Sequence, residues 1–101
     1  MEYQLVIEFS GESAEEFQKV IDLELLLEEQ LNSGIVDGND AGGGVVNIFI
    51  ITEDPDICFA EAMSHIASSF LKPVAAGYRP VDGDDYIRLW PKGDKSPFEL
   101  K

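Results

Sequence analysis

The chain of 101 residues has the length of one domain, and its twenty acidic and seven basic residues give a formal net charge of −13. The charge is uneven, because residues 1–71 hold fifteen acids and a single base, Lys19. Such an anion repels nucleic-acid phosphates and anionic membranes, so we expect neither as a partner. An acidic surface suits a basic protein partner, although acidic surfaces also serve solubility alone.

One cysteine, Cys58, excludes an internal disulfide and fits the reducing cytoplasm. The first ten residues, MEYQLVIEFS, lack a basic segment, and their apolar run is too short for a signal peptide or a membrane span. We therefore expect a cytoplasmic protein with a single domain over residues 1–91 and a loose tail over residues 92–101.

The first predicted element is a strand over residues 3–9, in which apolar and polar residues alternate. A helix follows, because Ser13 and Glu16 have the spacing of a capping box. We expect this helix to end near Leu31. Its predicted core stripe is Phe17, Val20, Leu23, Leu27 and Leu31.

A hairpin is predicted next, with a short strand near residues 34–39, a glycine turn and a strand over residues 45–52. Asp54 and Pro55 then mark the start of a second helix, and Lys72-Pro73 marks its end. Its predicted buried stripe is Phe59, Ala62, Met63, Ile66 and Phe70. Two extended segments, residues 75–80 and 85–91, flank a turn at residues 82–85.

The order of these elements is β-α-β-β-α-β, in which the last strand is either continuous or divided into a hairpin. This order predicts an α+β fold of the ferredoxin-like kind, a two-layer sandwich in which two helices cover one face of an antiparallel sheet. The first and third strands are expected at the centre of the sheet. The third, VVNIFIIT, is apolar on both faces, as a covered central strand would be.

The loop between Asp37 and Gly44 has three possible roles. Asp37, Asn39 and Asp40 resemble the start of a calcium loop, but position 41 is alanine and no glutamate follows within the loop. A phosphate-binding loop leads into a helix and usually supplies a lysine, whereas this loop is acidic and leads into a strand. The favoured interpretation is a hairpin turn, since Asp, Asn and Gly all permit left-handed conformations.

Cys58, Glu61 and His65 are spaced to share one helix face and could in principle hold zinc. An exposed helix face is the favoured interpretation, because the spacing is common and no fourth ligand is evident. His65 is the only histidine, and Cys58 has no predictable base partner unless His65, two turns away, supplies it. We therefore expect no metal, no cofactor, no catalytic residue and no enzymatic activity.

The sheet face away from the helices is the predicted binding surface. Ile87 and Leu89 are expected to point inward, toward the helices. The residues expected on the opposite face and assigned to partner binding are Asn47, Phe49, Tyr86, Arg88 and Trp90. A homodimer or another protein is the favoured occupant, and the alternatives are the chain's own C-terminal tail, a small molecule, or RNA bases stacked on the aromatics. Leu25 and Leu26 lie off the core stripe of the first helix and also call for cover.

Three motifs between residues 34 and 91 carry a resemblance: DGNDAGGG, NIFIITEDP and the closing strand that ends in WP. With them the chain resembles a group of small bacterial proteins that share a DGxDxGxG turn, an NIFIxTxDP passage and a C-terminal WP strand. The group is uncharacterised, so the resemblance implies a bacterial cytoplasmic domain and transfers no catalytic residue. Asp37, Asp40 and Asn47 are the polar members of this stretch, and they either fasten the turn or form part of a partner site.

The function favoured by the sequence is non-enzymatic binding of a protein partner. A concrete form is an acidic inhibitor of the immunity-protein type, which masks a basic enzyme and associates by electrostatic steering. The alternative is a protein that binds a small ligand or a cation through the open sheet face or the acidic loops.

Overall fold

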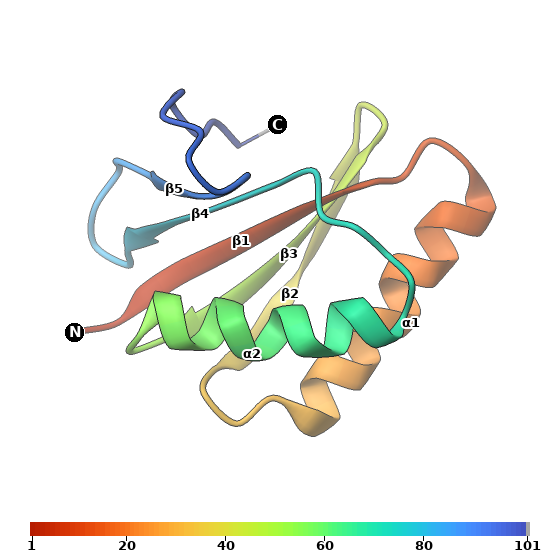
Figure 1. Cartoon of the computed structure of the whole chain (residues 1–101), viewed down its shortest axis with the longest axis horizontal. Helices are drawn as coiled ribbons and strands as arrows, with labels where there is room; N and C mark the ends of the chain where they lie inside the picture. The colour runs from red at the N-terminus through yellow and green to blue at the C-terminus, as the bar shows by residue number, and fades with distance from the viewer. Residues whose placement is uncertain (101) are drawn as a thin grey trace.

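The computed structural model describes residues 1–100, and Lys101 lies outside the described residues. The fold is α+β, with two helices on one side of a five-stranded antiparallel sheet (Figure 1). In chain order the elements are β1 (Tyr3–Ser10), α1 (Ala14–Gln30), β2 (Ile35–Gly42), β3 (Val45–Thr52), α2 (Pro55–Ser68), β4 (Ala75–Pro80) and β5 (Ile87–Trp90).

The strands lie in the order β2-β3-β1-β4-β5, and every neighbouring pair is antiparallel. β1 pairs with β3 along its whole length, from Tyr3 opposite Thr52 to Ser10 opposite Val45. On its other edge β1 pairs with β4. The first strand of the chain is therefore enclosed by two later ones, while β2 and β5 form the sheet edges.

The β2–β3 hairpin turns at Gly43 and Gly44, whose φ angles are 61° and 83°. Two successive positive φ angles match the right-handed twist of a hairpin, and glycine adopts them without strain. β2 continues to Gly42, further than the sequence predicted. Asp37 and Asp40 thus lie within β2 instead of in the turn, and the register between β2 and β3 shifts by a bulge between Val36 and Gly38.

Both helix starts match the sequence prediction. Ser13 accepts a hydrogen bond from the Glu16 backbone N–H at 3.1 Å, and the Glu16 side chain accepts one from the Ser13 N–H, which completes the capping box. Asp54 caps α2 by accepting from the Ile57 N–H at 3.1 Å, with Pro55 in the first turn. Neither helix within residues 1–100 is long and apolar enough to cross a membrane.

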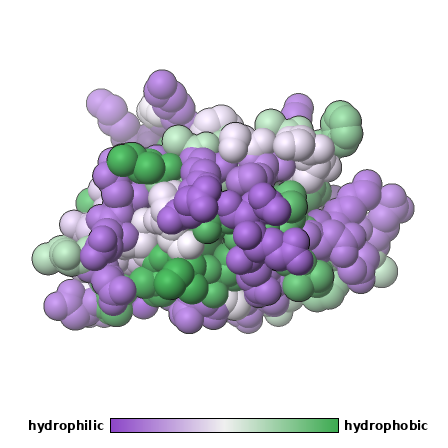
Figure 2. Space-filling model, turned by 90° about the horizontal axis from the view of Figure 1, so that it is seen from below, coloured by the Kyte–Doolittle hydropathy of each residue, from purple (hydrophilic) through white to green (hydrophobic). Residues whose placement is uncertain are grey.

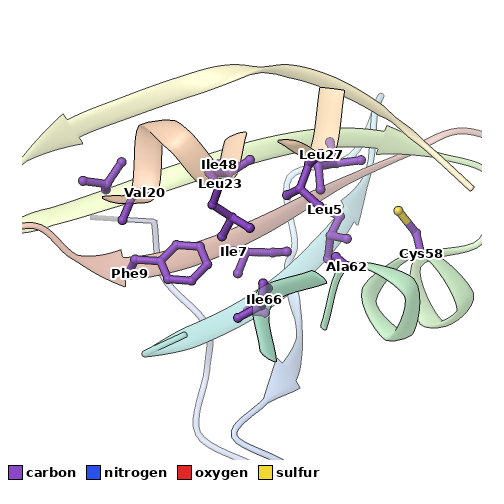
Figure 3. Close-up of a cluster of buried hydrophobic side chains, with 13 residues drawn as sticks. Leu5, Ile7, Phe9, Val20, Leu23, Leu27, Ile48, Cys58, Ala62 and Ile66 are labelled. Carbon is purple, nitrogen blue, oxygen red and sulfur yellow. The ribbon is translucent and has the colours of Figure 1, made fainter. Parts of the chain in front are cut away.

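The main core lies between the helices and the sheet (Figure 3). Its buried members are Leu5, Ile7, Phe9, Val20, Leu23, Leu27, Val46, Ile48, Ile50, Cys58, Ala62, Ile66 and Ala76. Phe17 was predicted in this core but lies at the flank of α1, where it is 37% exposed. Cys58 was predicted on an exposed helix face, and it is instead fully buried in the core.

α2 ends at Ser68, earlier than predicted, and this corrects the position of Phe70. Phe70 has a φ of 62° and is 95% exposed, although the helical stripe placed it in the core. Side-chain periodicity predicts a face only while the helix continues, and the left-handed residue turns the side chain outward. This conformation costs a non-glycine residue about 1–2 kcal/mol.

A bulge between β4 and β5 corrects the position of Trp90. Arg88 pairs with Gly77, but Trp90 pairs with Ala76, so Leu89 is the extra residue on β5. Trp90 therefore lies on the helix side, where its ring centroid is 6.2 Å from that of Phe59 and its Nε1 donates to the Pro73 carbonyl at 3.2 Å. Ile87, predicted to be inward, is 54% exposed beyond the helices.

Candidate functional site

The far face of the sheet, away from the helices, is covered by the C-terminal tail. Phe98 is 5% exposed and packs on Val6 and Ala75, with Phe49 and Tyr86 packed around it. The approach is close, since a Cβ on Gly77 would lie 2.7 Å from the Phe98 ring. Residues 92–101 were expected to be loose; within the described part, Phe98 packs on the sheet while residues 92–97 are exposed.

Arg88 holds this tail in place. Its Nε donates to the Ser96 carbonyl at 2.9 Å and its Nη2 to the Pro97 carbonyl at 3.0 Å. The guanidinium carbon also lies 5.7 Å from the centre of the Phe98 ring. Arg88 was predicted to meet a partner, but its donors are directed at the chain's own backbone.

The other predicted residues of this face are enclosed by the same packing. Tyr86 stacks on Phe98 with ring centroids 5.2 Å apart and donates from its hydroxyl to Gln4 Oε1 at 3.2 Å. Asn47 is 1% exposed, and Phe49 packs in the same cluster. The structure brings Phe49, Tyr86 and Arg88 together as tail-binding residues, and it separates them from Trp90.

Asp37 and Asp40 lie elsewhere, as exposed residues of β2 at the edge of the sheet. β2 is fastened to α1 by a hydrogen bond of 2.7 Å from Asn39 Nδ2 to Glu24 Oε1. We call the surface made by α1 and β2 the acidic face. Residues 12–40 hold nine acids and one base, and that base, Lys19, lies 3.4 Å from Glu15.

Exposed apolar side chains are interspersed with the acids of this face. Leu25 on α1 is 55% exposed, and Ile35 on the edge strand β2 is 75% exposed. Ile35 pairs with Ile51, so its side chain lies on the side of β2 away from α1. Phe17, Ile21 and Leu25 are spaced four residues apart and line one flank of α1. Figure 2, viewed toward the helices, shows hydrophilic residues over most of this side with hydrophobic residues in separate patches.

The sequence predicted only some of the exposed apolar residues of this surface. Leu25 was noted as lying off the core stripe, and it is exposed as expected, whereas Leu26 packs against the core. Ile35 gave no signal, because an isoleucine in a strand usually indicates burial. Its exposure follows from the place of β2 at the sheet edge, which the order of elements along the chain does not display.

Glu61 and Cys58 serve the structure at the start of α2. Glu61 accepts hydrogen bonds from the backbone N–H groups of Asn32, at 2.9 Å, and Ser33, at 2.8 Å, and also from the Ser33 hydroxyl. The Ser33 hydroxyl and these N–H groups lower the pKa of Glu61. Burial raises the pKa of the Cys58 thiol, which disfavours the reactive thiolate. Among residues 1–100 no group of three His, Cys, Asp or Glu side chains is arranged to hold a metal ion.

Comparison of the chain with protein-family models, with curated proteins and with solved structures finds no match. The resemblance to small bacterial proteins therefore stays an expectation from the motifs.

The first prediction concerns the seat of the tail. Phe98→Ala removes the aromatic that covers Val6, so we expect the free energy of unfolding to fall by about 2–3 kcal/mol. The melting temperature should fall by about 10–20 °C in a domain of this size. Leu100→Ala is the control, since Leu100 is 44% exposed, and it should change stability by less than about 0.5 kcal/mol. Equal melting temperatures for Phe98→Ala and wild type would show that the tail does not cover the sheet.

The second prediction concerns acid stability. The lowered pKa of Glu61 means that its ionised form is favoured in the folded state, so its contribution is complete above the ordinary pKa of 4.5 and is lost as the pH falls below that value. Glu61→Gln should lower the free energy of unfolding by about 1–2 kcal/mol at pH 7 and should lose less stability than wild type on acidification.

Urea denaturation at several pH values between neutrality and pH 3 measures both effects. Glu28→Gln is the matched control, because it neutralises an exposed carboxyl of α1. If Glu61→Gln and Glu28→Gln have the same stability at every pH, Glu61 does not fasten the loop.

Proposed function

We propose that the chain is a ferredoxin-like domain that acts by binding a basic protein through its acidic face. The strand order β2-β3-β1-β4, with one helix in each crossover, supports the ferredoxin-like topology, to which β5 adds an edge strand. One observation supports this function most directly. Negative charge that is not balanced by basic residues surrounds exposed apolar side chains. Residues 12–40 carry a net charge of −8, and their one base already faces Glu15.

This arrangement has the composition of a protein interface. Apolar anchors contribute most of the binding free energy when a charged rim surrounds them, and Leu25 and Ile35 are suitable anchors. Asp37, Asp40 and the α1 carboxylates form the acidic rim and would steer a basic partner. The part of the far sheet face around Val6 and Ala75 is less suitable, because Phe98 and Arg88 already cover it.

β2 also offers a main-chain contact. As an edge strand it has one row of backbone groups directed away from the sheet, and an extended segment can pair with such a row. The bulge near Asp37 and the two aspartates disfavour pairing with a neutral or acidic strand. Because the two aspartates are acidic, a basic segment is the strand that we expect to pair with β2.

We do not propose a catalytic function, because Glu61, Cys58 and Asp94, three groups with shifted pKa values, have structural roles. Glu61 fastens the α1–β2 loop, and Cys58 is a core residue. The pKa of Asp94 is lowered by hydrogen bonds from Ser96, within the tail. An inhibitor of the immunity-protein type in the cytoplasm, where the single buried thiol stays reduced, is the most concrete form of this function.

A second candidate function is the binding of a small cation under the tail. Glu8 is 2% exposed although its side chain is a carboxyl group, and it lines a hollow of about 280 Å³ together with Asp94, Glu99 and Arg88. The Arg88 donors are directed at carbonyl groups, and Arg88 Nη1 also lies 4.0 Å from Asp94 Oδ2, so Glu8 and Glu99 are the carboxyls that the hollow mainly offers. An organic amine is the cation that such a lining fits, since the carboxylates of its described residues are not arranged to hold a metal ion.

The third prediction tests the basic partner. Capture from native lysate at ~50 mM salt should retain a basic protein that is released at ~500 mM, since screening at high salt weakens electrostatic association. Leu25→Ser combined with Ile35→Ser should weaken binding to that protein at least about tenfold, the equivalent of 1.4 kcal/mol. Calorimetry with the purified partner measures the change.

Ile57→Ser is the matched control, because Ile57 is 60% exposed on α2, which is not part of the acidic face. Equal affinities for wild type and the double variant would place the interface elsewhere. If lysate yields no basic partner at either salt, the proposed function is wrong.

The fourth prediction separates the second candidate. Thermal melts with spermidine should raise the melting temperature if an organic amine binds, because about 100-fold excess over Kd adds roughly 2.7 kcal/mol. The rise should be absent in Glu8→Gln and present in Glu53→Gln, which changes an exposed carboxyl. No rise with spermidine would remove this candidate.

A further inference from the structure

The end of α2 holds an aromatic side chain away from the protein. Phe70 is 95% exposed, and its φ of 62° is a conformation that glycine usually supplies at the end of a helix. The turn is well defined, because the Ser69 N–H and hydroxyl both reach the Ile66 carbonyl, at 3.1 and 2.7 Å. Phe70 is thus a fixed apolar projection in a strained conformation.

An apolar hollow lies directly beside this projection. It has a volume of about 590 Å³ and is lined mainly by apolar side chains, among them Met63, Leu71 and Trp90. The rings of Phe59 and Trp90 pack together behind it. An aromatic ring entering the hollow would meet the Met63 thioether and the Trp90 ring, both of which favour aromatic contacts.

The charge of this region differs from that of the rest of the chain. Residues 62–81 form the longest stretch without an acid, and they contain Lys72 and Arg79. On the other side, Glu16 borders the same groove as Phe70 and is engaged in the α1 capping box. Two copies that each carry a charge of −13 repel one another, and they repel least when these stretches meet.

We propose that a second copy of the chain docks on this patch, with Phe70 of each copy inserted into the hollow of the other. A projection and a hollow on the same patch are self-complementary, so a two-fold axis satisfies both and closes the assembly at a dimer. The sequence predicted a homodimer through Phe49 and the far sheet face; the proposal moves the contact to the end of α2. Apart from Glu16, which lies beside Phe70, the acidic face is made of other residues and stays available in the dimer.

The choice of a second copy follows from charge. A basic partner gains nothing from a patch without acids and is attracted to the acidic face instead. For a copy of this chain, the same absence of acids removes the main barrier to close approach. Salt should therefore affect the two associations in opposite directions, tightening the dimer and weakening the complex with a basic protein.

Sedimentation equilibrium of the whole chain from about 1 to 300 µM, at ~50 and ~500 mM NaCl, tests the proposal, because these salt concentrations span weak and strong screening. We expect a monomer–dimer equilibrium with a lower Kd at high salt. Phe70→Gly should raise the Kd at least about 30-fold, the effect of losing a central anchor. The monomer of this variant should melt no lower than wild type, because glycine relieves the backbone strain.

Trp90 supplies an independent readout, since it is the only tryptophan of the chain. Its emission should shift to shorter wavelength as wild type is concentrated, because a ring entering the hollow displaces water. Met63→Glu, which places a charge in the hollow, should abolish both the shift and the dimer. Ile57→Ser is the control on the same helix and should retain them.

A wild-type monomer throughout this range at both salts would overturn the proposal. A dimer that Phe70→Gly and Met63→Glu leave intact would also overturn it, because the contact would lie elsewhere. A dimer that dissociates at high salt would contradict the charge argument. None of these results bears on capture of a basic protein, so the proposed function is tested separately.

Discussion

The fold depends on the burial of β1 on both of its faces. Leu5, Val6, Ile7, Glu8 and Phe9 are all at most 2% exposed. Alternate side chains of a strand point to opposite faces, so one layer of helices can cover only half of this set. The helices cover Leu5, Ile7 and Phe9, and the tail must cover the other face, where Phe98 packs on Val6.

This constraint decides which surfaces remain for partners. The far sheet face is apolar enough to resemble an interface, but its apolar groups and Arg88 bind the tail. Exposed apolar groups are left on the helices and at the β2 edge of the sheet, in two different electrostatic settings. Leu25 and Ile35 lie among carboxylates, whereas Phe70 lies at the start of a region without them. A basic protein and a second copy of the chain are the partners that these settings separately favour.

The sequence predicted the local structure correctly wherever residues close together in the chain alone determine it. The capping box of Ser13 and Glu16 and the Asp54-Pro55 helix start involve residues close together in the chain, and all were predicted correctly. The strand from Val45 to Thr52 has the predicted limits for the same reason. The division of the last strand into β4 and β5 was one of the two predicted forms, because the acidic turn between them is a local signal.

The sequence predictions were wrong where contacts between distant residues, or a break in the periodicity of an element, determine which way a side chain points. Trp90 was assigned to the wrong face because a bulge on β5 adds one residue, and one residue reverses the side of a strand. Phe70 was assigned to the core because its spacing fits α2, which ends two residues earlier. Cys58 was assigned to the surface, although a small apolar thiol fits the core beside Ala62.

The sequence by itself determined the elements, their order and the concentration of charge in the first two-thirds of the chain. These properties follow from short-range hydrogen bonding, periodicity and composition, which do not require knowledge of distant neighbours. Only the tertiary structure decided that the tail covers the sheet and that Asp37 and Asp40 lie on an edge strand. Those outcomes depend on which segments far apart in the chain come into contact, because burial is a property of the assembled layers and not of any single element.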